Sequence, residues 1–227
     1  MKFLCVFGSK SDEPFYDEIC SRLKTPPEIC SAHRDPERLK DLVTSTDAEF
    51  IIAGAGLAAH LPGVIASMTR KPVIGMPIAA NLDGLDSLLS IMQMPPGIPV
   101  LCSGVNATGS ILRFLDNLDF QGIDLISDGK CEDAMDKARE MMERFNYPEG
   151  NFPVVFHDSI RSKGREDGIN VFCGKLKAED APMLLEITKN GLWVGLNRGD
   201  NAVLAAIQIL ERNNPFPELI EYREKLK

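Results

Sequence analysis

The feature that most constrains this chain of 227 residues is the alternation of short apolar runs with helix-like stretches over its first 104 residues. Five runs are typical of buried strands: 3–7, 29–30, 50–53, 72–76 and 100–102. A continuous apolar run, without a polar face, is typical of a parallel strand that helices cover on both sides. The pattern therefore predicts a doubly wound α/β fold with right-handed crossovers.

Composition and charge narrow the classes of function. The net charge of −8 argues against a nucleic-acid partner, whereas a small anion needs only a few basic groups and backbone N–H donors. No apolar run approaches the ~20 residues of a membrane span, and no signal peptide is expected because a strand starts at once. The six cysteines lack a C-x-x-C pair and indicate buried free thiols in the cytoplasm. A zinc site is not expected, since none of the three histidines has a ligand-spaced neighbour.

Polar residues gather where the first two predicted strands end. Gly8–Asp12 leads into a helix, so its hydroxyls and free N–H groups can form an anion cradle, with Asp12 also suited to capping the helix. Ser31–Pro36 ends in an Asp-Pro pair that fits the N-cap and the first helical position. Open α/β sheets bind ligands at this edge, which makes His33 and Arg34 candidate site residues. The alternative is a lone surface histidine beside a solvated arginine.

A loop of small residues, 54–63, follows the third run. It contains G-x-G-x-x-A, a weak match to the dinucleotide-binding fingerprint. The glycines follow the third strand rather than the first, and no acidic residue ends the next strand to hold a ribose. We therefore favour a loop whose backbone approaches a flat ligand closely.

Together these motifs resemble the PurE family of purine biosynthesis, the N5-carboxyaminoimidazole ribonucleotide mutases. The resemblance covers residues 3 to about 104 and resumes near Leu192, where 201–210 is similar to the family's closing helix. The His33-Arg34 pair and the second histidine, His60, resemble the mutase branch rather than the branch that uses carbon dioxide directly. The motifs that carry it are Gly8–Asp12, Ser31–Arg34, Ala53–Gly63 and Gly84–Pro95.

The resemblance implies a flavodoxin-like three-layer αβα sandwich with a five-stranded parallel sheet, assembled as an octamer with active sites between subunits. It implies a reaction that moves the carboxylate of the ribonucleotide substrate from the N5 amine to carbon 4 of the imidazole. No cofactor or metal is implied. A dry pocket must keep the released carbon dioxide beside the ring, and an imidazole with a reference pKa of ~6.5 can take the proton of carbon 4.

The resemblance also implies individual roles. His33 is expected to carry the proton, and His60 to enclose the migrating carboxyl group. The expected substrate-binding residues are Ser9, Ser11, Ser31 and Arg34 for the phosphate, Asp12 for the ribose, and Ala53, Gly54, Ala55, Gly56, Ala58, Ala59 and Leu61 around the carboxyl group. Two other functions stay open: a carboxylase that combines aminoimidazole ribonucleotide (AIR) with carbon dioxide, and a non-catalytic ribotide-binding protein.

Residues 105–191 depart from the family and read as an inserted α/β segment of unknown role, so we expect a catalytic unit of 1–104 and 192–227. His157 and Asp158 within the segment are expected to be structural or surface residues. A faint repeat, Gly104–Leu112 against Gly195–Leu204, means that the segment either interrupts the last strand–helix unit or duplicates it. The helix at 201–210 is apolar on nearly every side, which predicts partial burial against a neighbouring subunit of a homo-oligomer.

Overall fold

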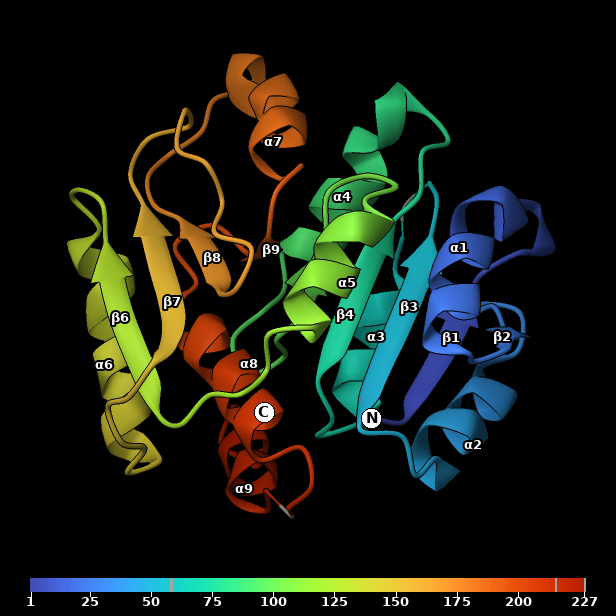
Figure 1. Ribbon diagram of the computed structural model, residues 1–227, viewed down its shortest axis with the longest axis horizontal. Coiled ribbons are helices and arrows are strands. Elements are labelled where there is room, and N and C mark those ends of the chain that lie inside the picture. Colours follow the sequence, from blue (N-terminus) through green and yellow to red (C-terminus); the bar gives the residue numbers. More distant parts are fainter. Residues whose placement is uncertain (58, 215, 227) are drawn as a thin grey trace.

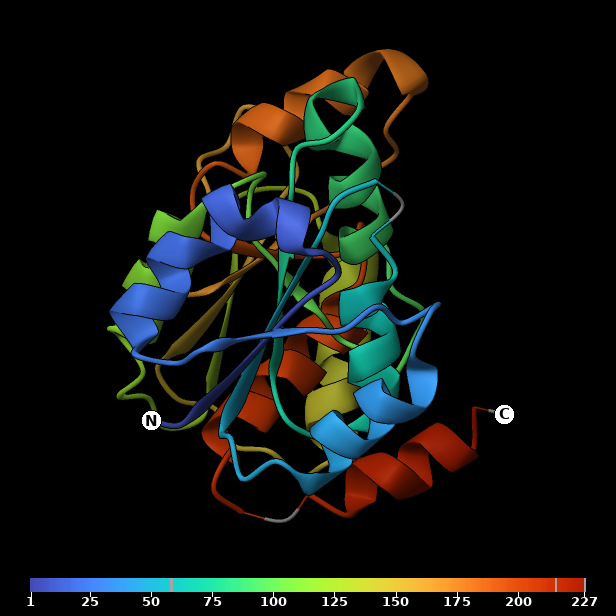
Figure 2. The ribbon, with the colours of Figure 1, turned by 90° about the vertical axis from the view of Figure 1, so that its right-hand side faces the viewer.

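The computed structural model describes residues 1–57, 59–214 and 216–226, and within them nine strands form one sheet. The strand order is β2-β1-β3-β4-β5-β9-β8-β7-β6, and helices lie on both faces (Figure 1, Figure 2). None of the described helices combines the length and apolar character needed to cross a membrane.

The first five strands are parallel to one another, which confirms the expected fold. Their order, 2-1-3-4-5, is that of flavodoxin-like proteins. Alternate side chains of one strand enter opposite sides of the core, as Phe7 and Val6 do. The five strands are β1 (Phe3–Phe7), β2 (Pro27–Ile29), β3 (Phe50–Ala55), β4 (Val73–Pro77) and β5 (Leu101–Cys102).

Five helices cover this part of the sheet. Asp35 caps α2 as expected, because its carboxylate accepts a hydrogen bond from the backbone N–H of Arg38 at 3.3 Å. Short 3₁₀ turns, η1 (Lys10–Asp12) and η2 (Leu82–Gly84), precede α1 and α4. On one face lie α1 (Glu13–Leu23) and α5 (Thr108–Leu115), and on the other α2 (Pro36–Ser45), α3 (Leu61–Met68) and α4 (Leu85–Met92).

The second part of the chain continues the same sheet. Its four strands are parallel to one another, and β9 runs antiparallel to β5 through the pair Cys102 and Trp193. The elements are β6 (Ile123–Ser127), α6 (Glu132–Arg144), β7 (Phe152–His157), β8 (Ile169–Phe172), η3 (Ala178–Asp180), α7 (Ala181–Ile187), β9 (Leu192–Val194), α8 (Gly199–Leu210) and α9 (Glu218–Glu224).

The two parts, which we call the first half (β1 to α5) and the second half (β6 to α8), pair their strands in the same register. Cys102 and Trp193 occupy the same place in their halves and pair with each other, so an approximate two-fold axis passes between them. The matched pairs are Phe3 with Phe50, Ile74 with Leu101 and Gly75 with Cys102 in the first half, and Ile123 with Phe152, Ile169 with Leu192 and Asn170 with Trp193 in the second.

This symmetry distinguishes the two interpretations of the faint sequence repeat, Gly104–Leu112 against Gly195–Leu204, which were interruption and duplication. Both strand–helix units, β5 with α5 and β9 with α8, are complete, and the repeat extends back to β6, β7 and β8. The structure therefore favours duplication over a simple interruption. Among the described residues the second half has no counterpart of β2, α2 or α3. Residues 145–151 lead from α6 directly to β7, and residues 158–168 connect β7 to β8 without a helix. The grouping of 192–227 with 1–104 as one functional unit stays a prediction.

Helix α8 corrects one expectation. Every residue from Gly199 to Ile209 is buried, and the helix packs against α6, β7 and β8 of its own chain. The apolar side chains on all sides of this helix are therefore buried within one chain. They do not require a neighbouring subunit, so the basis of that prediction was wrong. The six cysteines are free and buried, as expected.

Candidate active site

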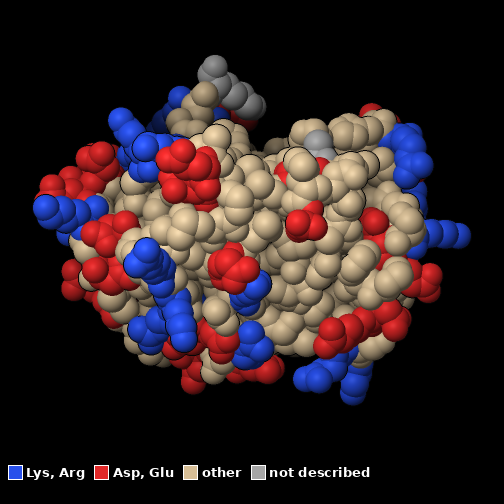
Figure 3. All heavy atoms as spheres, turned by 90° about the horizontal axis from the view of Figure 1, so that it is seen from above, with Lys and Arg blue, Asp and Glu red and all other residues tan. Residues whose placement is uncertain are grey.

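The carboxyl ends of β1 to β4 meet at one edge of the sheet. Phe7 pairs with both Ile29 and Gly54, and Ala55 pairs with Pro77, so four strands end nearly level. In Figure 1 the arrow of β3 points toward this end, and Figure 3 looks down on it. Figure 3 shows tan, uncharged surface over much of this face, with Asp and Glu side chains scattered across it. The loops that follow these strands carry most of the predicted site residues.

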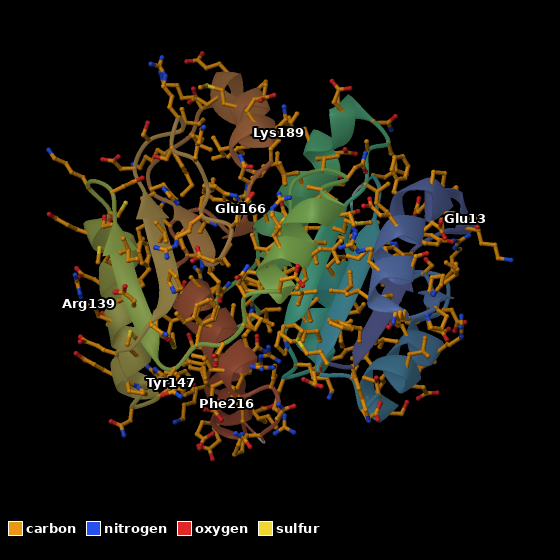
Figure 4. The ribbon with its side chains drawn as sticks, viewed as in Figure 1. Glu13, Arg139, Tyr147, Glu166, Lys189 and Phe216 are labelled. Carbon is orange, nitrogen blue, oxygen red and sulfur yellow. The ribbon has the colours of Figure 1, made fainter. Side chains whose placement is uncertain are left out.

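The loop after β1 brings two hydroxyls and a carboxylate together. Ser9 Oγ accepts hydrogen bonds from the backbone N–H of Ser11 at 3.2 Å and from Ser11 Oγ at 2.8 Å. Ser11 Oγ also lies 3.4 Å from Asp12 Oδ1. Burial raises the pKa of Asp12, against the opposing effect of hydrogen bonds from Ser11 and the Ser9 backbone. Glu13, labelled in Figure 4, marks the point where this loop enters α1.

Arg34 connects the loops after β1 and β2. Its Nη2 donates to the Gly8 carbonyl oxygen at 3.3 Å, and its backbone N–H donates to Ser31 Oγ at 3.4 Å. The side chain is exposed, so the guanidinium presents N–H groups beside the hydroxyls of the first loop. This arrangement suits a phosphate, which takes charged donors and hydroxyl donors together.

Two histidines from different loops lie side by side. The ring centroids of His33 and His60 are 5.3 Å apart, with the ring planes at 70°. His33 follows β2, whereas His60 directly precedes α3. Both side chains are exposed. The fold thus brings together the two residues for which catalytic roles were predicted.

The end of β3 requires its glycines. A Cβ on Gly54 would lie 2.6 Å from the ring of Phe7, and one on Gly56 would lie 3.2 Å from the Cβ of Ala80. The small residues therefore let β3 approach β1 and the loop after β4. The Ala55 and Ala59 side chains are buried at this edge.

Three of the predicted substrate-binding residues, Ala53, Ala58 and Leu61, do not present a described side chain to the site. Ala58 lies outside the described residues. The side chains of Ala53 and Leu61 belong to the hydrophobic core, so any contact of theirs with a ligand would go through the backbone. Sequence reasoning also missed the loop after β4, where Ala80 faces Gly56 and the Leu82 side chain is 72% exposed. The available signal was a pair of alanines and an apolar residue between a strand and a helix.

The site is open on one chain, because His33, Arg34 and His60 are all exposed. Two hollows of about 620 Å³ each lie elsewhere, one between α3 and the α8–α9 region and one beside β6 and α6. Among the described residues no group of three His, Cys, Asp or Glu is placed to hold a metal ion.

Comparison with known proteins decides the family. The model of the family described as AIR carboxylase matches residues 2–111. The N5-carboxyaminoimidazole ribonucleotide mutase of Methanocaldococcus jannaschii is 49% identical over 106 residues, which are 44% of this chain and 68% of the relative. The mutase of Pyrococcus abyssi is 44% identical over 149 residues, or 61% and 82%. The chain belongs to the AIR carboxylase, or PurE, family.

The PurE relatives are enzymes of purine biosynthesis, and their names divide between two activities. A protein named phosphoribosylaminoimidazole carboxylase, from Candida glabrata, is 41% identical over 145 residues, which are 60% of this chain but 25% of that larger relative. The PurE family match ends within α5, so all the candidate site residues lie inside the shared part.

Proposed function

We propose that the protein is a mutase that converts N5-carboxyaminoimidazole ribonucleotide to 4-carboxy-5-aminoimidazole ribonucleotide in the cytoplasm. The observation that carries the proposal is the His33–His60 pair, whose ring centroids are 5.3 Å apart and which comes from the loops after β2 and β3. The mutase names of several close relatives support it.

We assign binding of the ribotide to the loops after β1 and β2. Arg34 and the hydroxyls of Ser9, Ser11 and Ser31 hold the phosphate, and Asp12 accepts hydrogen bonds from the ribose hydroxyls. These contacts place the imidazole ring of the substrate over the end of β3. They are made equally in the ground and transition states, so they serve affinity more than rate.

The chemistry needs one proton carrier and one enclosed space. The bond between nitrogen and the carboxyl carbon breaks, the nitrogen takes a proton, and carbon dioxide is released beside the ring. Carbon 4 then attacks the carbon dioxide and loses its own proton. Nothing enters or leaves overall, so one imidazole can give the first proton and take the second. We assign that role to His33, and to His60 with the 54–59 loop the retention of carbon dioxide.

Retention of carbon dioxide requires a closed site, which one chain does not provide. Leu57 is 54% exposed and Leu82 is 72% exposed, and both flank the open edge. We propose that a second copy of the chain covers this edge in a homo-oligomer, as the family's octamer implies.

The test is turnover by the purified protein. The mutase should consume N5-carboxyaminoimidazole ribonucleotide without added bicarbonate, and its product is identified by the ultraviolet spectrum. A rate that follows dissolved carbon dioxide with AIR, without use of the carbamate, would replace the mutase by the carboxylase, the activity named for the Candida glabrata relative. Ribotide binding without either reaction would support the non-catalytic alternative.

A further inference from the structure

Asn106 and Asn197 occupy the same place in the two halves. Each follows the last strand of its half and has a φ of +54°. Positive φ is accessible to Asn at modest cost, and to Gly at none. The shared conformation turns both side chains back toward the neighbouring parallel strand.

Each asparagine clamps the residues that follow that strand. The backbone N–H of Asn106 donates to the Pro77 carbonyl oxygen at 2.9 Å, and its Oδ1 accepts from the backbone N–H of Ala79 at 3.1 Å. In the second half, the backbone N–H of Asn197 donates to the Phe172 carbonyl oxygen at 2.9 Å, and its Oδ1 accepts from the Gly174 N–H at 2.8 Å.

In the first half, the clamped segment supports the candidate site. The backbone N–H of Ile78 donates to the Ala55 carbonyl oxygen at 3.1 Å, and the Ile78 carbonyl oxygen would lie 3.4 Å from a Cβ on Gly56. The Cβ of Ala80 would lie 3.2 Å from the same added Cβ. A displacement of residues 78–80 therefore moves the backbone against which we propose that carbon dioxide is held.

In the second half, the corresponding edge is filled by its own side chains. His157 stands in the place of Ala55 and is buried. Its Nδ1 lies 2.7 Å from Asp128 Oδ2, and its Nε2 lies 2.9 Å from Asn170 Oδ1. Ser162 Oγ donates to Asp128 Oδ2 at 2.9 Å, so the connection from β7 to β8 lies over this edge. Neither histidine nitrogen is left for a ligand.

Two further features distinguish this edge from the candidate active site. Glu166 of the same connection pairs with Arg113 of α5 at 2.8 Å, and Figure 4 shows Glu166 beside α5. The second half also lacks, among the described residues, the elements that carry His33, Arg34 and His60 in the first half. The two asparagines thus share the same backbone conformation and the same Oδ1 hydrogen bond, but they have unequal surroundings.

We propose that Asn106 is a positioning residue for the active site, and that Asn197 has only the structural part of the same role. The proposal rests on the function proposed above. One hydrogen bond contributes little to stability, but a displacement of about 1 Å in a reacting geometry can lower a rate ~10²-fold. A pocket wall made of backbone is especially sensitive to such a displacement.

The test compares Asn106→Gly with Asn197→Gly. Glycine keeps the positive φ and removes the side-chain amide. Asn197 also donates from its Nδ2 to the Gly174 carbonyl oxygen at 2.7 Å, so Asn197→Gly should lose at least as much stability as Asn106→Gly. Asn106→Gly should lower kcat about 10-fold or more with little change in KM, because the phosphate-binding loops are untouched. Asn197→Gly should leave both constants unchanged. Asn106→Asp keeps an acceptor oxygen and should restore most of kcat.

A second measurement does not depend on turnover. Hydrogen exchange of the backbone amides at 54–57 and 78–80 should become faster in Asn106→Gly and stay unchanged in Asn197→Gly. Equal losses of kcat in the two glycine variants, or unchanged exchange and kcat in Asn106→Gly, would overturn the proposal. If the wild-type protein has neither activity, the proposed function fails, and the exchange rates alone still decide whether Asn106 orders the 54–57 loop.

Discussion

The backbone of Gly104 lies directly against the carbonyl oxygen of Thr188, so that a Cβ on Gly104 would stand 2.5 Å from it. The matching contact joins Gly195 to the Met92 carbonyl oxygen, at 2.7 Å from an added Cβ. In each case a glycine after the last strand of one half touches the end of a helix of the other half. The two halves are therefore packed against each other through the same contact made twice.

We expect Gly104→Ala to destabilise the protein by about 1–3 kcal/mol, since the added methyl group meets rigid backbone. Gly195→Ala should have a similar cost. Gly109→Ala is the matched control, because its Cβ would meet only the flexible end of Arg113 within α5 and alanine favours a helix. The free energy of unfolding in urea is the measurement. Equal stability of Gly104→Ala and wild type would contradict the close packing of the halves.

For His33, we expect His33→Asn to lower kcat by ~10²–10⁴-fold, because asparagine is polar but cannot accept the proton of carbon 4. Arg34→Ala should act mainly on KM, since the phosphate contact is present in both ground and transition states. Steady-state constants for both variants separate the two roles. A His33→Asn enzyme with more than about a tenth of the wild-type kcat would remove His33 from the chemistry.

The hydrogen bonds of Asp128 predict that its carboxylate stabilises the folded protein near neutral pH and that acid removes this stabilisation. Burial alone would raise its pKa, but hydrogen bonds with His157 and Ser162, the charge of His157 and the Asp158 backbone outweigh burial and lower it. A lowered pKa in the folded state means that the contribution is present above the ordinary aspartate range, near ~3.9, and is lost as pH falls through the folded value.

Asp128→Asn should therefore cost on the order of 1 kcal/mol at neutral pH, a modest figure because the carboxylate is 38% exposed. The difference from wild type should shrink as pH falls below about 4. Unfolding measured from pH 3 to pH 7 tests this, with the exposed Asp119→Asn as the control. A difference that grows on acidification would refute the assignment.

Each chain should bind one ribotide, although its two halves are duplicates. The corresponding edge of the second half is occupied by His157 and Asp128, which are hydrogen-bonded to each other. Calorimetric titration with 4-carboxy-5-aminoimidazole ribonucleotide should give one site per chain. Arg34→Ala should weaken binding, whereas Lys130→Ala, which alters the second edge, should not. A stoichiometry of two would show that the second half binds ligand as well.

The exposed leucines at the open edge predict an oligomer. If a second copy covers the open edge, Leu57→Ser and Leu82→Ser should weaken the oligomer and lower kcat while leaving the free energy of unfolding of one chain nearly unchanged. Light scattering at micromolar concentration gives the mass, with Ile220→Ser, exposed on α9 away from the edge, as the control. A monomer with full activity would rule out a site closed by another chain.

The fold of the first half could be predicted from the sequence because its determinants are local. Each strand is an apolar run, and Asp35 with Pro36 starts α2 as the residue types require. The same holds for the loops of the site, whose positions follow from where the strands end. The approach of His33 to His60 required the parallel order of β1, β2 and β3, which the family resemblance supplied.

The second half could not be predicted in the same way. β9 has three residues, and what decides its place is a pairing with β5, some ninety positions earlier in the chain, rather than anything local. We therefore assigned 192–227 to the first unit, a grouping that stays a prediction, and we gave α8 a neighbouring subunit where its own chain buries it. The structural role expected for His157 does agree with its burial between Asp128 and Asn170.

The pairing of Cys102 with Trp193 has a consequence for how this molecule can vary. At the two-fold axis of a homodimer a residue meets its own copy, so one substitution changes both partners at once. Here a small thiol faces a large indole at equivalent positions, a combination that two identical chains could not place on their axis. Joining both halves in one polypeptide lets each side of the axis mutate alone, and it fixes their ratio at one to one.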